Sequence, residues 1–205
     1  MPDYDLDFAY EIDGAEDARA KYNAWASTYD QSFAQAWGYI APREIAGILN
    51  GTGAEGPVLD IGAGTGLVAE HLTGHVVDGI DIAPDMLDIA RSKGLYRELI
   101  IGDLTQPLAL NSGTYGAVIS CGTFTHGHVG PECFPELLRV TRPGAQFVCG
   151  TIPAVFDQAG FGSELALMVA RGLISPVSFV DIPIYEGADH EHAQDRGLVM
   201  VFTRV

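Results

Sequence analysis

The sequence predicts an α/β fold, a doubly wound and mostly parallel seven-stranded sheet with an antiparallel terminal strand. Apolar runs alternate with helical segments from residue 57 onward. These runs are continuous, which is typical of parallel strands that are buried on both faces. The chain ends with two apolar runs joined by the polar loop GADHEHAQDRG, which indicates an antiparallel pair.

Each element follows from its local pattern. Helices are expected at 15–32 and 41–50, before the alternating part begins. A proline in the first turn marks the start of two later helices. The alternating part predicts strands at 58–61, 75–82, 98–103, 115–122 and 145–152, helices at 66–72, 84–92, 131–140 and 160–174, and terminal strands at 177–186 and 198–205.

Length and composition indicate one soluble globular domain. The chain has 205 residues, of which 47% are apolar and 19% charged. No apolar run approaches the roughly 18 residues of a membrane span, and the N-terminus is acidic where a signal peptide would be basic. The three cysteines are odd in number and lack CxxC spacing. We expect reduced, buried thiols and therefore a cytoplasmic protein.

The charge balance narrows the class of partner. Acidic residues number 27 against 11 basic ones, which gives a net charge of −16. Binding to phosphates needs clustered Lys and Arg, and the sequence has no such cluster. We therefore expect neither nucleic acid nor membrane as a partner, and a small molecule as the substrate. The oligomeric state cannot be read from the sequence.

Polar residues stand at the ends of four predicted strands. In open α/β sheets the ligand binds at the carboxyl ends of the strands. Asp60, Asp81 and Asp103 end three consecutive strands, and Cys121 with Gly122 ends the fourth. Because buried carboxylates are costly unless something pairs with them, three in register predict a polar ligand.

The glycine-rich stretch VLDIGAGTG (58–66) restricts that ligand further. A dinucleotide site requires GxGxxG, but Leu67 stands at the third glycine position, and the P-loop sequence GK[ST] is absent. Gly62, Gly64 and Gly66 allow a ligand to approach the backbone, and N–H groups at the start of the following helix favour an anion. Asp60 beside them favours a cation. A zwitterionic amino acid meets both demands.

The next two aspartates suggest what is attached to that amino acid. Asp81 is placed to accept hydrogen bonds from both hydroxyls of a ribose. Asp103 can accept one from the exocyclic amine of adenine. An amino acid, a ribose and an adenine together make S-adenosylmethionine, which is the predicted cofactor, with S-adenosylhomocysteine as the product.

At these residues the sequence resembles the class I S-adenosylmethionine-dependent methyltransferases. The resemblance rests on VLDIGAGTG, GIDIAPDML (79–87), IIGDL (100–104) and RVTRPGAQFV (139–148). It departs from the family pattern at Ala145, where a second glycine is usual. YNAWASTYD (22–30) and THGHVGPE (125–132) are similar to the methyltransferase-like proteins of the Williams–Beuren chromosome region.

The resemblance implies a Rossmann-like sheet and a single methyltransferase domain over residues 1–205, with 1–50 as a helical cap over the cofactor site. It also carries further residues into that site. Asp103 and Leu104 are implied at the adenine edge, and Ile82 and Met86 serve either adenine contact or core packing. Neighbouring positions complete the expected cofactor set with Ala63, Leu67 and Cys121.

Three aromatic residues of the cap lie on one face of the predicted helix. Tyr22, Trp25 and Tyr29 recur at spacings of three and four. Such a stripe is typical of amphipathic packing. The resemblance instead suggests a lid over the methionine end of the cofactor, where aromatic rings attract a sulfonium by cation–π interaction. Both interpretations stay open at this point.

Histidines are the candidate catalytic groups. His126 and His128 follow the fourth strand, where the acceptor would meet the methyl group. They either orient the acceptor or act as a general base, or they are structural. His190 and His192 lie in the polar loop between the terminal strands, but no third ligand is placed by spacing, so no metal site is expected.

The predicted function is S-adenosylmethionine-dependent methyl transfer to a small-molecule acceptor by in-line displacement. A non-catalytic protein that binds S-adenosylmethionine or S-adenosylhomocysteine is the main alternative, and it would have an occluded acceptor pocket. An NAD-dependent oxidoreductase is disfavoured by Leu67 and Asp60. Neither the acceptor nor the atom that is methylated can be read from the sequence.

Overall fold

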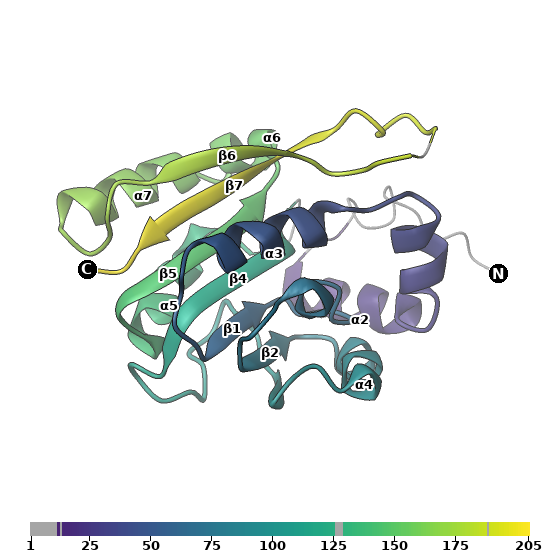
Figure 1. Cartoon of the computed structure of the whole chain (residues 1–205), viewed down its shortest axis with the longest axis horizontal. Coiled ribbons are helices and arrows are strands. Elements are labelled where there is room, and N and C mark those ends of the chain that lie inside the picture. The colour runs from purple at the N-terminus through teal and green to yellow at the C-terminus, as the bar shows by residue number, and fades with distance from the viewer. Residues whose placement is uncertain (1–11, 13, 126–128, 188) are drawn as a thin grey trace.

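A seven-stranded sheet forms the centre of the molecule in the computed structural model, which describes residues 12, 14–125, 129–187 and 189–205. The strand order is β3-β2-β1-β4-β5-β7-β6 (Figure 1). The strands are β1 (Val58–Ile61), β2 (Val77–Asp81), β3 (Glu98–Ile101), β4 (Tyr115–Phe124), β5 (Thr141–Thr151), β6 (Ser178–Pro183) and β7 (Arg196–Thr203).

The pairing confirms the predicted fold class. Strands β1 to β5 pair in parallel, and β7 runs antiparallel to both β5 and β6. The antiparallel terminal strand is β7, which lies inside the sheet, while β6 forms the edge. The strand with the more buried residues takes the inner position, since Ser178–Asp181 of β6 are exposed and most of β7 is not.

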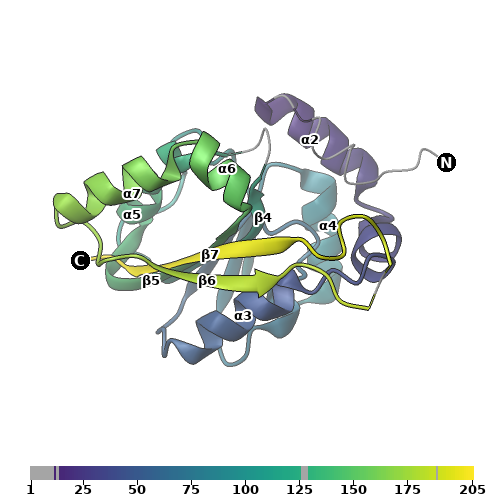
Figure 2. The same ribbon diagram turned by 90° about the horizontal axis from the view of Figure 1, so that it is seen from above.

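Helices cover both faces of the sheet (Figure 2). The helix α3 (Ala41–Gly51) packs on one face, over an apolar cluster that includes Ile45, Leu49 and Val148. The opposite face carries α5 (Phe134–Val140), α6 (Pro153–Gln158) and α7 (Phe161–Ala170). Its cluster includes Phe134 and Phe147, so residues 147 and 148 point to opposite faces, as the period of a strand requires.

The N-terminal segment differs from the prediction of one helix at 15–32. The helix α2 (Gly14–Trp25) ends early, and a short π-helical turn, η1 (Asp30–Gln35), follows. The Thr28 hydroxyl donates to the carbonyl oxygen of Trp25, and the Trp25 indole donates to Ser32 Oγ. Side-chain hydrogen bonds of this kind compete with the helix, which explains the break. Both pieces lie at the end of the sheet to which the parallel strands point (Figure 1).

The helix predicted at 66–72 is also wrong. Only one 3₁₀ turn forms there, η2 (Ala69–His71). The Asn50 side chain donates to the carbonyl oxygen of His71 and accepts from the N–H of Thr73, at 2.9 and 3.2 Å. These bonds from α3 end the turn, and so short a segment does not offset the cost of starting a helix.

The other predicted helices are present, but their first or last residues differ from the prediction. The helix α4 (Pro84–Lys93) begins at its proline as expected. The helix predicted at 131–140 is a 3₁₀ turn, η3 (Pro131–Cys133), followed by α5, and the sequence did not predict α6. All three cysteines are free. No helix in the described part of the chain is long and apolar enough to cross a membrane.

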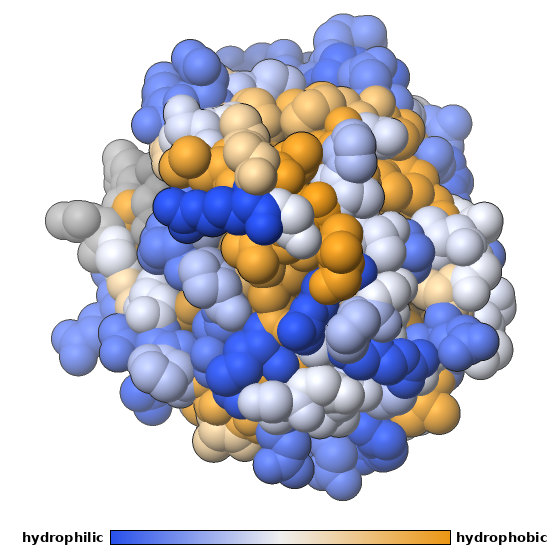
Figure 3. Space-filling model, turned by 90° about the vertical axis from the view of Figure 1, so that its left-hand side faces the viewer, coloured by the Kyte–Doolittle hydropathy of each residue, from blue (hydrophilic) through white to orange (hydrophobic). Residues whose placement is uncertain are grey.

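The surface opposite α2 carries an apolar area (Figure 3). The exposed apolar side chains near the end of α7 and the C-terminus are Leu167, Leu173 and Val205. The N–H of Val205 donates to the carbonyl oxygen of Leu173 at 3.0 Å, which holds two of them side by side. This area lies away from the carboxyl ends of the parallel strands, where the predicted site residues gather.

Candidate functional site

A cavity of about 970 Å³, partly open to solvent, lies at the carboxyl ends of β1, β2 and β4. We call it the first cavity. The structure places most of the predicted cofactor residues on its wall, namely Tyr22, Tyr29, Gly62, Ala63, Gly64, Leu67, Asp81, Ile82, Met86, Asp103, Leu104 and Cys121. Trp25, Asp60 and Gly66 do not line it. The predicted catalytic residues His126 and His128 lie outside the described residues.

Asp81, at the end of β2, is held by the backbone. Its Oδ2 accepts from the N–H of Gly64 and its Oδ1 from the N–H of Ala83, both at 2.8 Å. Burial raises the pKa of this carboxyl, and the backbone hydrogen bonds act against that rise. A carboxylate offers about four lone-pair positions, so Asp81 keeps capacity to accept a hydrogen bond from a ligand in the cavity.

The glycine-rich loop departs from one expectation. The N–H groups of Gly62 and Ala63 donate to the carbonyl oxygen of Ile80, and that of Gly66 donates to the carbonyl oxygen of Ala63. With Gly64 bonded to Asp81, these donors are engaged within the protein. The following segment forms only a 3₁₀ turn, so these four N–H groups do not serve as free donors at a helix start as expected.

Two glycines of this loop are required by the geometry. Gly62 has φ of 66°, and a Cβ there would lie 2.0 Å from the side-chain oxygen of Thr123. Gly64 has φ of 53°, and a Cβ there would meet no heavy atom closer than the carbonyl oxygen of Gly62 at 4.0 Å. A side chain at either position would strain the backbone. At Gly64 it would also occupy open space at the wall of the first cavity.

Asp60 is fully buried on β1. The Tyr96 hydroxyl donates to its Oδ2 at 2.7 Å, and its Oδ1 has no hydrogen-bond partner among the described residues. Burial raises the pKa of this carboxyl to about 7, the hydrogen bond from Tyr96 lowers it, and the charge of Asp81 raises it. The sequence analysis did not identify Tyr96. The one related signal in the sequence is Gly79 in the middle of a predicted strand, because a Cβ at position 79 would lie 2.9 Å from the Tyr96 ring.

The third aspartate begins the loop that connects β3 to β4. Asp103 Oδ1 accepts from the N–H and the hydroxyl of Thr105 at 2.8 and 2.7 Å, as in an Asx turn. The next residue, Leu104, is buried and lines the cavity. The turn leaves Asp103 Oδ2 outside these two hydrogen bonds.

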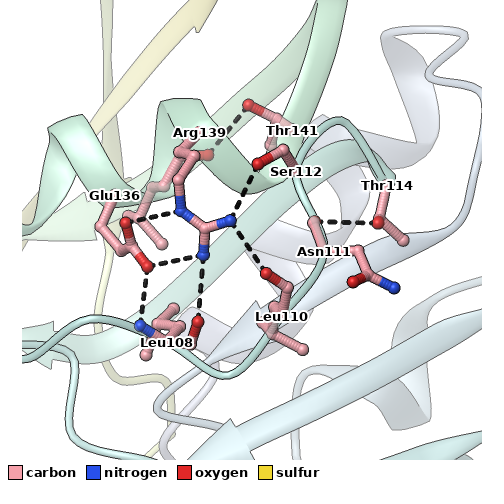
Figure 4. Close-up of polar contacts among 9 residues, drawn as sticks. Leu108, Leu110, Asn111, Ser112, Thr114, Glu136, Arg139 and Thr141 are labelled. Atoms are coloured by element: carbon pink, nitrogen blue, oxygen red, sulfur yellow. Dashed lines mark hydrogen bonds and ion pairs between the residues drawn. The ribbon is translucent and has the colours of Figure 1, made fainter.

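An arginine of α5 organises the far end of that loop (Figure 4). The Arg139 guanidinium donates to the carbonyl oxygens of Leu108 and Leu110 and to Ser112 Oγ, at 2.9 to 3.0 Å. It also pairs with Glu136, which accepts from the N–H of Leu108 at 2.7 Å. No helix forms between β3 and β4, so these side chains supply the hydrogen bonds that a helix would make internally. No motif in the sequence points to this role.

Of the three aromatic residues of the predicted stripe, one is buried in a core and two line the first cavity. Trp25 is 1% exposed and lies 4.9 Å from Tyr29 and 5.5 Å from Phe33, measured between ring centroids. Its neighbours Tyr22 and Tyr29 line the first cavity. Burial raises the pKa of Tyr29 well above its usual value, so its hydroxyl stays protonated at neutral pH. The stripe therefore both packs in the core and lines the first cavity.

A second cavity of about 730 Å³ adjoins the first. Five residues line both, namely Tyr22, Tyr29, Tyr39, Cys121 and Gly122. At this junction the Tyr39 hydroxyl lies 3.1 Å from Cys121 Sγ. Burial raises the pKa of Cys121 to about 12, against the lowering effect of Tyr39. Tyr39 was missed because it follows the predicted helix in a stretch without a recognisable motif.

Comparison with known proteins agrees with this arrangement. Residues 59–149 match the family described as a methyltransferase domain. Solved structures of similar shape cover nearly the whole chain. The [4+2]-cyclase SpnF aligns with a TM-score of 0.66 and 15% identity, over 94% of this chain and 97% of its own. The chain has the class I methyltransferase fold.

Two further similarities add detail to this assignment. The TehB-like S-adenosylmethionine-dependent methyltransferase from Corynebacterium glutamicum aligns with a TM-score of 0.60 and 19% identity, over 91% of this chain and 99% of that one. Human methyltransferase-like protein 27 is 38% identical over 139 residues, which are 63% of this chain. The chain spans about half, 55%, of the length of that relative.

Proposed function

We propose that this chain transfers a methyl group from S-adenosylmethionine to a small-molecule acceptor. The observation that carries the proposal is the first cavity, where Asp81, Asp103 and the glycine loop meet at neighbouring strand ends. The class I methyltransferase fold and the family match over residues 59–149 support the same conclusion.

The residues of the first cavity fit the cofactor. Asp81 keeps lone pairs free for the ribose hydroxyls, and Asp103 Oδ2 is available to the exocyclic amine of adenine. The apolar side chains Ile82, Met86 and Leu104 offer an apolar wall to the base. Gly64 leaves open space where the backbone borders the cavity.

Asp60 suits the amino-acid end through its charge rather than through a visible contact. It does not line the cavity, but its Oδ1 has no hydrogen-bond partner within the described part of the chain, and burial raises its pKa to about 7, close to physiological pH. An ammonium group bound nearby would favour the ionised form. We therefore propose that Asp60 holds negative charge beneath the ammonium of the cofactor, and that Tyr96 fixes its orientation.

The aromatic side chains at the junction suit the sulfonium. Tyr22 and Tyr29 line both cavities, and their rings pack at 6.5 Å between centroids. Aromatic rings attract a cation through their faces, by about 0.5–2 kcal/mol depending on desolvation. This interaction gives the two tyrosines a role beyond packing.

When bound, the cofactor would supply an electrophilic methyl group: the acceptor's lone pair would form the new bond as the methyl–sulfur bond breaks with its electron pair left on sulfur, and the acceptor's proton would leave to bulk solvent with the product. The chain has to hold both molecules in line and exclude water, so no side chain is required as a nucleophile. The second cavity provides a place for the acceptor, which favours an enzyme over a non-catalytic binding protein.

Calorimetry and mass spectrometry test the proposal. We expect S-adenosylhomocysteine to bind the purified protein and NADH not to bind. Incubation with isotope-labelled S-adenosylmethionine and a metabolite extract should transfer the label to a small molecule. Binding of NADH in place of S-adenosylhomocysteine would show that the proposal is wrong, and binding without any labelled product would favour the non-catalytic alternative.

A further inference from the structure

We infer that the second cavity holds the methyl acceptor and that this acceptor is an uncharged molecule with an aromatic ring. The inference rests on the proposed function and extends it to a substrate class. The cavity is walled by six aromatic side chains, namely Tyr22, Trp25, Tyr29, Phe33, Tyr39 and Tyr185. Aliphatic side chains complete the wall, among them Ile182, Ile184 and Val199.

The described lining favours an uncharged ligand. None of the described residues that line the second cavity is Asp, Glu, Lys, Arg or His. Burial raises the pKa of Tyr29, Tyr39 and Cys121, so these groups are also neutral at physiological pH. A charged ligand would lose its hydration here without gaining a counter-charge, which costs several kcal/mol even after relaxation.

The arrangement of the rings indicates an aromatic ligand. Phe33 lies 5.1 Å from Tyr39, and Tyr39 lies 5.8 Å from Tyr185, with tilts of 46° and 44° between the rings. Tilted rings at these separations are within the range in which aromatic groups attract one another, so a further ring can join them. A protonated amine would also be attracted, but it has no lone pair with which to attack a methyl group.

The residues that line both cavities indicate where the reacting end of this ligand lies. Tyr29, Tyr39 and Cys121 line both cavities, so an acceptor heteroatom beside them faces the first cavity. The hydroxyl of Tyr39 and the thiol of Cys121, 3.1 Å apart, can each donate a hydrogen bond to that heteroatom or accept one from it. The acceptor we infer is thus a ring bearing a neutral hydroxyl, thiol or amine.

Three probes of one shape and different charge test the ligand class. Each is titrated by calorimetry into the protein saturated with S-adenosylhomocysteine: 2-naphthol, 2-naphthoate and 2-naphthylmethylammonium. We expect 2-naphthol to bind at least about tenfold more tightly than either ion. Equal or tighter binding of either ion, or no binding of 2-naphthol, would overturn the inference.

Substitutions on the wall test the location. Ile184 and Ile152 line the second cavity and not the first, so Ile184→Trp and Ile152→Trp add bulk to the second cavity from two separate segments. Either should weaken 2-naphthol binding at least tenfold while S-adenosylhomocysteine binds as before. Val180→Trp, on exposed β6 and outside both cavities, is the matched control and should change neither. Unchanged 2-naphthol binding in a folded cavity variant would contradict the assigned location.

A spectroscopic measurement does not depend on these variants. The indole N–H signal of Trp25, which lines the second cavity, should shift in the wild-type NMR spectrum when 2-naphthol is added. Absence of a shift under saturating 2-naphthol would place the probe elsewhere. Failure of S-adenosylhomocysteine to bind the wild type would instead contradict the proposed function, so the two failures are distinguishable.

Discussion

The Tyr96 hydroxyl donates a 2.7 Å hydrogen bond to one oxygen of Asp60, while the other oxygen stays buried without a partner among the described residues. Burial raises the pKa of this carboxyl from its ordinary value of 3.8 to about 7, and the hydrogen bond from Tyr96 limits the rise. Ionisation at neutral pH is incomplete, and a cation bound nearby would complete it. Two predictions depend on this relationship.

The first concerns ligand binding and pH. If the ammonium of S-adenosylhomocysteine interacts with ionised Asp60, its affinity should rise as the pH increases from 5.5 to 8, roughly tenfold for each unit well below the pKa and levelling off above it. Methylthioadenosine, which lacks the amino-acid end, should show a weaker dependence. Calorimetry at several pH values measures both, and Asp60→Asn should abolish the difference. Equal pH profiles for the two ligands in the wild type would show that Asp60 is structural.

The second concerns stability without ligand. Because the folded pKa is raised, the folded state binds more protons than the unfolded state between about pH 4 and pH 7. The contribution of Asp60 to the free energy of unfolding therefore falls as the pH rises through this window. Asp60→Asn does not titrate. The Tm of Asp60→Asn relative to the Tm of the wild type should therefore rise as the pH increases from 5 to 8, which thermal denaturation measures.

Asp81→Ala tests the ribose contact. We expect S-adenosylhomocysteine to bind more weakly by about 1.5–3 kcal/mol, the typical contribution of charge-assisted hydrogen bonds. Asp81→Asn keeps an acceptor for the loop N–H groups and separates the loss of charge from the loss of loop structure. The control is Asp85→Ala, an exposed acid on α4 that lines neither cavity. Unchanged affinity in folded Asp81→Ala would rule out the ribose contact.

Arg139 is predicted to act on the cofactor through the loop that follows β3. Arg139→Met removes the hydrogen bonds to Leu108, Leu110 and Ser112. Amide exchange should accelerate at 104–112, and binding of S-adenosylhomocysteine and of methylthioadenosine should weaken alike, since both carry adenine. Arg171→Met, exposed at the end of α7, is the control. A loss confined to S-adenosylhomocysteine would place the effect at the amino-acid end instead.

Amide exchange in the N-terminal segment should show two behaviours. Around Trp25 and Phe33, which are 1% and 4% exposed, exchange should already be slow without ligand. In α2, where Ala15 and Ala18 line the first cavity, it should slow when S-adenosylhomocysteine binds. Trp25→Ala should destabilise the protein by about 3–5 kcal/mol, as loss of a buried Trp does, and Trp25→Phe by less. Fast exchange at 15–24 with ligand bound would show that α2 does not cover the site.

The sheet and most of the first cavity could be predicted because their signals are local. Asp81 ends β2, Asp103 follows two residues after the end of β3, and apolar runs identify the strands themselves. The engagement of the loop N–H groups could not be predicted, since most of their acceptors, Ile80 and Asp81, belong to the neighbouring strand β2. Tyr96 and Arg139 were missed for the same reason, because their partners are distant in sequence and no spacing reveals them.

Cys121 places a sulfur atom beside the predicted path of an alkylating group. Thiolates react with such groups and thiols hardly do. Burial raises the pKa of Cys121 to about 12, so the side chain is almost entirely a thiol at pH 7. The same burial that keeps the wall of the junction neutral would therefore protect the protein against methylating itself. A thiol with a lower pKa at this position would be ionised and would react with the methyl donor.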